Sequence, residues 1–110
     1  MTQYPTLTER KAARVAEIRR ALGVLRERLY DYARRHGGKF LLYGSAARGA
    51  LRYDSDVDLV LDFPPELEHD AWTFAEEACW DLRLQPDIMP ASWSRPEFLK
   101  RVRNEAVAIG

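Results

Sequence analysis

The sequence has little of what marks secreted, zinc-binding or membrane proteins. It contains one cysteine, Cys79, which excludes an internal disulfide and a cysteine-rich zinc site. No apolar run approaches the ~20 residues of a membrane span, and the N-terminal stretch MTQYPTLTERKAARV lacks the apolar core of a signal peptide. Repeats and low-complexity tracts are absent. We therefore expect one cytoplasmic domain of 110 residues that does not contact a membrane, with Cys79 as a small buried hydrophobe.

The charge balance hides an asymmetry between the two halves of the chain. The net charge is zero, but residues 1–53 hold 12 Lys/Arg and 4 Asp/Glu, whereas residues 54–110 hold 5 and 13. Such polarity often marks a surface for a charged partner. The alternative is that the two halves neutralise each other within the fold, and composition leaves both open.

A long amphipathic helix is predicted at the start of the chain. Thr6 and Glu9 have the spacing of a capping box, and the pair Gly37-Gly38 ends the helix. Because this helix is longer than the next strand can cover, its N-terminal half is expected to protrude and pack on another chain. Apolar residues recur at intervals of three and four and form one stripe: Val15, Ile18, Leu22, Leu25, Leu29 and Tyr32.

The stretch from residue 39 to residue 63 organises the rest of the chain. Its apolar run 40–43 predicts a short buried strand. Gly44 and Ser45 then open a short helix over 46–48, where free peptide N–H groups and a hydroxyl suit phosphate oxygens. The sequence therefore predicts a phosphate-binding turn between a strand and a helix.

Three aspartates follow this turn. Asp54, Asp56 and Asp58 are separated by single residues, so on a strand they would share one face. Like charges stacked in this way oppose folding, and Mg²⁺ removes the conflict because it takes one or two carboxylates together with substrate phosphates. The simpler alternative is a polar edge strand that shows its carboxylates to water. The opposite face of the same strand would be apolar, with Val57, Leu59 and Leu61.

The remainder of the chain predicts two more helices and two more strands. An amphipathic helix begins near Glu66 and has Trp72 and Trp80 as packing residues, while His69 is expected to face solvent. Residues 84–90 form a proline-bounded edge strand that carries a single carboxylate, Asp87. The other expected features are Ser94 as N-cap of a last helix and inward-facing Phe98, Leu99 and Val102. Residues 107–109 would add a final short strand or simply cover the core.

These residues resemble the signature of a known family. Gly44-Ser45, ten residues, and then Asp56-Val57-Asp58 is similar to the pattern of the polymerase-beta nucleotidyltransferase superfamily. The fuller string 44–49, with 55–59, resembles its smallest branch, the minimal nucleotidyltransferases. The resemblance implies an α/β fold, a small mixed β-sheet with helices packed on it. Residues 1–36 would form the N-terminal helix of that single domain, and residues 37–110 its minimal core.

The resemblance also implies roles for the site residues. The carboxylates would hold two Mg²⁺ ions, which also grip the triphosphate of ATP, while Asp87 would accept the proton of an attacking hydroxyl. Gly44 and Ser45 would contact the β- and γ-phosphates, and Asp54 would lie outside the metal ligands. The predicted catalytic and metal-binding residues are thus Asp56, Asp58 and Asp87. The predicted nucleotide-binding residues are Gly44, Ser45, Arg48 and Ser55.

The function implied by this branch is that of an antitoxin enzyme. It would transfer AMP from ATP to a tyrosine of a HEPN-type ribonuclease toxin, with which it forms a complex. Larger relatives carry a helical domain for a small acceptor, and we expect a minimal core to leave the acceptor side open to a macromolecule. Two alternatives stay open: a binding-only antitoxin, and a transferase acting on a small molecule or an RNA end. A nucleic acid partner is not expected, because the basic residues are spread around the first helix: Arg10, Lys11, Arg14, Arg19, Arg20, Arg26 and Arg28.

Overall fold

The capping box at Thr6 starts the long helix as predicted. In the computed structural model, which describes residues 4–110, α1 runs over Leu7–His36. The Thr6 hydroxyl accepts a hydrogen bond from the Glu9 N–H at 3.1 Å, and the Glu9 carboxylate accepts one from the Thr6 N–H at 3.2 Å. Gly37 ends the helix in the left-handed conformation, with φ of 71°. Residues 1–3 of the predicted segment 1–36 lie outside the described residues.

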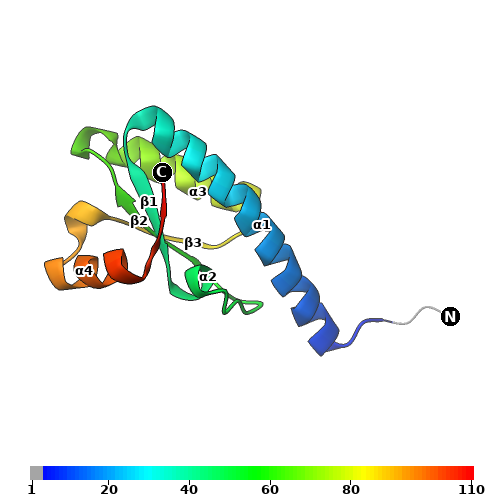
Figure 1. The fold of residues 1–110 in the computed structure, drawn as a ribbon. Helices are drawn as coiled ribbons and strands as arrows, with labels where there is room; N and C mark the ends of the chain where they lie inside the picture. The colour runs from blue at the N-terminus through cyan, green and yellow to red at the C-terminus, as the bar shows by residue number, and fades with distance from the viewer. Residues whose placement is uncertain (1–3) are drawn as a thin grey trace.

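The apolar stripe of α1 lies in the core. Four residues at the centre of the stripe are buried, as the spacing predicts: Ile18, Leu22, Leu25 and Leu29. Ala33 is also buried and extends the stripe by one position. Figure 1 shows the N-terminal end of α1 projecting beyond the sheet. The free part is shorter than the predicted half, because Lys11 already contacts the rest of the chain: its ammonium lies 4.5 Å from the centre of the Tyr53 ring. Packing of this end on another chain stays a prediction.

Four strands form a mixed sheet in the order β3-β2-β1-β4. β1 pairs antiparallel with both β2 and β4, whereas β2 and β3 are parallel. The predicted α/β fold with a small mixed sheet is confirmed, including the edge position of β3 and the short final strand. The bounds are β1 Lys39–Tyr43, β2 Val57–Asp62, β3 Pro86–Pro90 and β4 Val107–Ile109.

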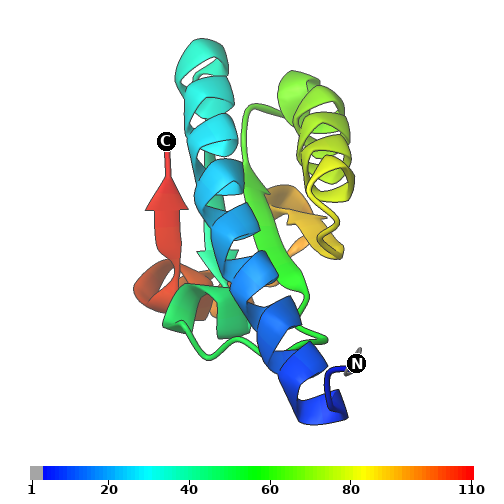
Figure 2. The ribbon, with the colours of Figure 1, turned by 90° about the vertical axis from the view of Figure 1, so that its right-hand side faces the viewer.

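Helices cover both faces of this sheet. α1 and α3 (Glu68–Asp81) run alongside each other on one face, as Figure 2 shows, and α4 (Pro96–Glu105) lies on the other. The core between α1, α3 and the sheet is the larger of the two; the α4 side has a smaller cluster around Leu41, Val60 and Val102. The short α2 (Gly44–Arg48) lies at the end of β1. None of the helices within residues 4–110 has both the length and the apolarity to cross a bilayer.

Two predicted helix starts differ in the structure. A 3₁₀ turn over Pro65–Leu67 precedes α3, which begins at Glu68. α4 has Arg95 as its N-cap, with no side-chain capping bond, so the assignment of Ser94 to that position is wrong. The Ser94 hydroxyl instead donates to the Met89 sulfur and the Pro90 carbonyl at the end of β3. Proline suits the first helical position and restricts the residue before it to an extended conformation, which makes Arg95 the N-cap and explains the shift by one residue.

The two tryptophans of α3 differ in how they meet the predicted packing role: Trp72 packs against the larger core, as predicted, whereas Trp80 does not. α3 lies close to the sheet through a stripe of small residues, and Trp80 falls outside it with 57% of its surface exposed. Trp72 is half-buried, and its ring lies 5.4 Å from that of Trp93. Cys79 is fully buried, as predicted; burial first, and then the charge of Glu76, raise the pKa of its thiol to about 12. His69 is exposed, also as predicted.

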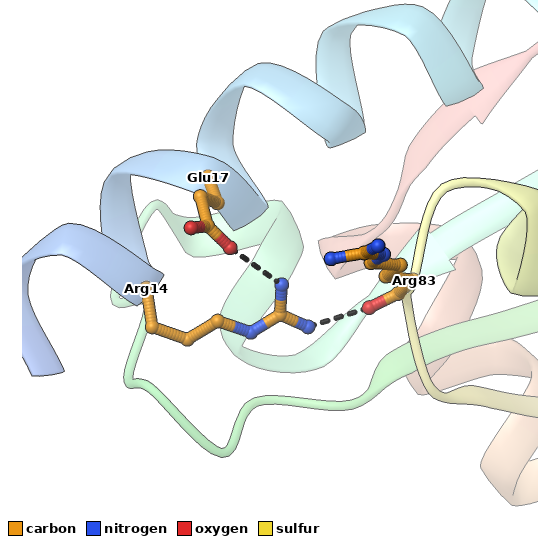
Figure 3. A network of polar contacts seen from close by, with 3 residues as sticks. All are labelled: Arg14, Glu17 and Arg83. Atoms are coloured by element: carbon orange, nitrogen blue, oxygen red, sulfur yellow. Dashed lines mark hydrogen bonds and ion pairs between the residues drawn. The ribbon is translucent and has the colours of Figure 1, made fainter. Parts of the chain in front are cut away.

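Arg14 ties α1 to the turn between α3 and β3. Figure 3 shows its guanidinium between the Glu17 carboxylate, 3.2 Å away, and the carbonyl oxygen of Arg83. Arg83 has a positive φ of 58°, the only such value at a non-glycine residue among residues 4–110. This conformation is uncommon for a residue with a side chain. The Arg14 contact therefore helps to hold the turn that leads into β3.

Truncating the buried part of α1 tests this packing. We expect Leu29→Ala to lower the free energy of unfolding by about 2–5 kcal/mol, because the side chain is fully buried and its loss leaves a cavity. Leu7→Ala, at a position that is 65% exposed, should change it by less than about 0.5 kcal/mol. Urea unfolding followed by circular dichroism measures both; equal losses would contradict the docking of α1 described above.

Candidate active site

The register of three strands brings two carboxylates and a phenol into one row. Asp58 lies opposite Asp87 in the parallel β2–β3 pair, and opposite Tyr43 in the antiparallel β1–β2 pair. Residues directly opposite each other project from the same face of a sheet. That face is the one covered by α4, because Tyr43 packs with the α4-side cluster. Asp87, predicted from a different part of the chain, therefore does meet Asp58.

The other two aspartates lie outside the strand, contrary to the predicted alternation along it. β2 begins at Val57, so Asp56 directly precedes it and is exposed. Asp54 belongs to the preceding turn and forms an exposed ion pair with Arg52 at 3.7 Å. The apolar half of the prediction is confirmed, since the side chains that face away from Asp58 are buried: Val57, Leu59 and Leu61. Of the three spaced aspartates, only Asp58 lies on a strand of the sheet.

Gly44 places the start of α2 against the carboxylate of Asp58. Its φ is 72°, and a Cβ at this position would overlap the Asp58 Oδ2 atom. Only glycine satisfies both conditions without strain. The predicted turn between strand and helix is thus confirmed, and it brings the backbone of Gly44 directly against the carboxylate.

The two serines of the predicted nucleotide site bond to each other. The Ser55 hydroxyl accepts a hydrogen bond from the Arg52 N–H at 2.7 Å, and the Ser45 hydroxyl donates to Ser55 at 3.3 Å. This pair ties the loop before β2 to α2. Because α2 has only five residues, its dipole is small, and the exposed guanidinium of Arg48 is the stronger source of positive charge. Direct phosphate contacts by these residues stay a prediction.

The negative charges of neighbouring carboxylates repel each other at this site. Partial burial of Asp58, then the negative charges of Asp87 and Asp56, and a hydrogen bond shared with Asp87, raise the pKa of Asp58 to about 6. Burial, followed by the charges of Asp58 and Asp87, also raises the pKa of Tyr43. Each of these shifts has the sign expected where negative charges crowd together. A cation placed here would relieve the repulsion.

This group fits a divalent cation in charge and in donor type. Within residues 4–110, no group of three or more His, Cys, Asp or Glu side chains is arranged to hold a metal ion by itself. Mg²⁺ commonly takes one or two carboxylates and completes its shell with water and substrate phosphates. Asp58 and Asp87 supply such a pair, and Asp56 contributes negative charge nearby.

The sequence did not mark every residue near this pair. Tyr43 was predicted only as a strand residue, and Phe98 only as an inward-facing one. The Phe98 ring lies 5.8 Å from that of Tyr43, edge to face, and so joins α4 to the site. Tyr43 directly precedes the Gly-Ser turn, which could have drawn attention to it; no local signal marks Phe98. A hollow of about 440 Å³ lies between α1 and β4, but its lining includes neither these two residues nor the carboxylates.

Two comparisons with known proteins agree with this geometry. A family model described as a nucleotidyltransferase domain matches residues 18–109. The chain belongs to this family. A solved structure of a protein proposed to be a minimal nucleotidyltransferase superposes with a TM-score of 0.64 and 30% sequence identity, over 81% of this chain and 93% of its own. This nucleotidyltransferase is therefore of the minimal type, as the motif resemblance implies. No curated protein matches the chain.

The raised pKa of Asp58 predicts how stability depends on pH in the metal-free protein. A carboxyl whose pKa is higher in the folded state than in the unfolded state stabilises the fold below pH ~4, and this contribution is lost as pH rises through about 6. Asp58→Asn removes the repulsion. We expect it to raise the free energy of unfolding at pH 7.5 by about 1 kcal/mol, a value reduced for solvent screening, with little change at pH 4.

Urea unfolding in the presence of EDTA at the two pH values measures this difference. Asp62→Asn is the matched control on the same strand, because Asp62 lies near cations, with Lys39 at 4.0 Å and Arg103 at 3.8 Å. It should be neutral or slightly destabilising at pH 7.5. A loss of stability in Asp58→Asn at pH 7.5 would show that the carboxylate is not strained.

Proposed function

We propose that this nucleotidyltransferase uses Mg²⁺ and ATP to transfer AMP to a tyrosine hydroxyl of a HEPN-type toxin and so acts as its antitoxin. The observation that carries the chemistry is the pairing of Asp58 with Asp87 in register on parallel strands, with the backbone of Gly44 directly against the Asp58 carboxylate. The toxin partner and the tyrosine acceptor rest on the resemblance of the motif to the minimal branch. Family membership supports nucleotidyl transfer in general.

Each residue of the site has a separate role in the proposed reaction. Asp58 and Asp87, with Asp56, would hold two Mg²⁺ ions, which supply charge for the attacking and the leaving oxygens. Gly44 and Ser45 would contact the β- and γ-phosphates, and Arg48 would offset the negative charge of these groups. The hydroxyl oxygen of the acceptor forms a bond to the α-phosphorus, the bond to the bridging oxygen breaks, and pyrophosphate leaves. Asp87 accepts the hydroxyl proton.

The position of Asp87 supports a large acceptor. β3 is an edge strand, and Asp87 is exposed on it, whereas Asp58 is half-buried in the middle of the sheet. An acceptor hydroxyl can therefore reach Asp87 from the open side of β3 without entering a deep pocket. This geometry suits a tyrosine on the surface of a partner protein.

Replacing the carboxylates tests the chemistry. We expect Asp56→Asn and Asp58→Asn each to lower AMP transfer at least 100-fold, since Mg²⁺ loses a charged ligand at the reacting phosphate. Transfer of label from α-labelled ATP to the co-purified partner measures this. Asp54→Asn is the control, because Asp54 lies in the turn and pairs with Arg52. Full activity in Asp58→Asn, with an unchanged circular dichroism spectrum, would refute the assignment.

Mass spectrometry of the partner protein identifies the acceptor. Incubation of the partner with the wild-type protein, ATP and Mg²⁺ should add the mass of one AMP to a tyrosine of the partner. Neutralisation of the partner without any mass change would favour the binding-only antitoxin instead. Label that appears on an RNA end or a small molecule, and not on the protein, would favour the other alternative.

A further inference from the structure

A cleft beside the carboxylates separates α2 from α4. It has a volume of about 340 Å³, and its lining includes Tyr43 at the end of β1. Gly44, which touches Asp58, and Tyr43, which lies opposite Asp58, are both in its lining, so the cleft opens directly next to the carboxylate pair. The complete lining is Tyr43, Gly44, Arg48, Phe98, Arg101, Val102 and Glu105.

One face of α4 supplies the far wall of this cleft. Positions 98, 101, 102 and 105 are three and four residues apart, which places them on one side of a helix. Phe98 packs edge to face on Tyr43, and the Arg101 guanidinium lies over the Phe98 ring, 5.6 Å from its centre. A continuous set of contacts therefore runs from Arg101 through Phe98 and Tyr43 to Asp58.

The cleft carries a net positive charge. Arg48 at the end of α2 and Arg101 on α4 both line it, against one carboxylate, Glu105. Among the ion pairs found within residues 4–110, none includes Arg48 or Arg101, whereas Arg103 of the same helix pairs with Asp62. Two guanidinium groups without an acidic partner, on opposite walls of a cleft, are suited to a polyanion.

We infer that this cleft binds the triphosphate of the donor nucleotide, and that Arg101 is a second cationic contact to it across from Arg48. This inference rests on the proposed function, because it extends the site at Asp58 and Asp87. The cation–π contact with Phe98 restricts the Arg101 side chain before the nucleotide binds, which lowers the entropy lost on binding. The ligand class is a nucleoside triphosphate, and the β- and γ-phosphates are the groups that Arg101 contacts.

The test compares two arginines of one helix in nucleotide binding. We expect Arg101→Gln to weaken binding of a non-hydrolysable ATP analogue, measured by calorimetry with Mg²⁺, about tenfold, since a charge-assisted contact is lost. Arg103→Gln should bind within about twofold of wild type, since Arg103 pairs with Asp62 outside this cleft. Arg101→Lys should keep part of the affinity, because it keeps the charge without the planar fork.

AMP distinguishes a phosphate contact from a contact to the base or sugar. If Arg101 holds the terminal phosphates, Arg101→Gln should change AMP affinity by less than about twofold. An equal loss for AMP and for the ATP analogue would overturn the phosphate assignment. Binding of the analogue by Arg101→Gln as tight as by Arg103→Gln would overturn the role of Arg101 while leaving the proposed function standing. Absence of nucleotide binding by the wild-type protein would overturn both.

Discussion

Two carboxylates held side by side on neighbouring strands are the constraint on which the rest of the structure depends. Asp58 and Asp87 lie opposite each other because β2 and β3 are parallel and paired in that register. Their repulsion and the partial burial of Asp58 oppose folding, as the raised pKa of Asp58 indicates. The opposite face of the same strands compensates, since it is apolar and packs against α1 and α3 in the larger core. The stability of the domain and the chemistry of its site thus come from the two faces of one sheet.

The elements around the carboxylates are arranged so that one end of the α4 face stays open. α4 packs over Leu41 and Val60 in the middle of the sheet and reaches Tyr43 through Phe98. It leaves Asp87 exposed on the edge strand. On the other side, Gly44 lets α2 begin directly against Asp58. Asp58 therefore lies between the α2–α4 cleft and the free edge of β3. In our proposal the donor occupies the cleft and the acceptor approaches from that edge.

Much of the fold could be predicted because its signals are local. The capping box of α1, its glycine stop, the apolar stripe and the proline-bounded edge strand each depend on contacts within a few residues or on a simple period. The errors have local causes too. Pro96 makes Arg95 the N-cap of α4 in place of Ser94. Trp80 lies outside the stripe of small residues through which α3 packs on the sheet. The alternating aspartates are on a strand only from Asp58 onward, because the turn at Arg52–Ser55 occupies the residues before it.

By itself, the sequence determined the helices and strands, the glycine turn before α2 and the identity of the acidic residues, since these follow from short-range sterics and hydrogen bonding. Only the tertiary structure decided that Asp58 faces Asp87, that Tyr43 lies beside them and that Arg101 lines the same cleft as Arg48. Strand register and helix packing set those relations between residues far apart in the chain. A local pattern carries no information about such distances, because every side chain in the core contributes to the register that is chosen.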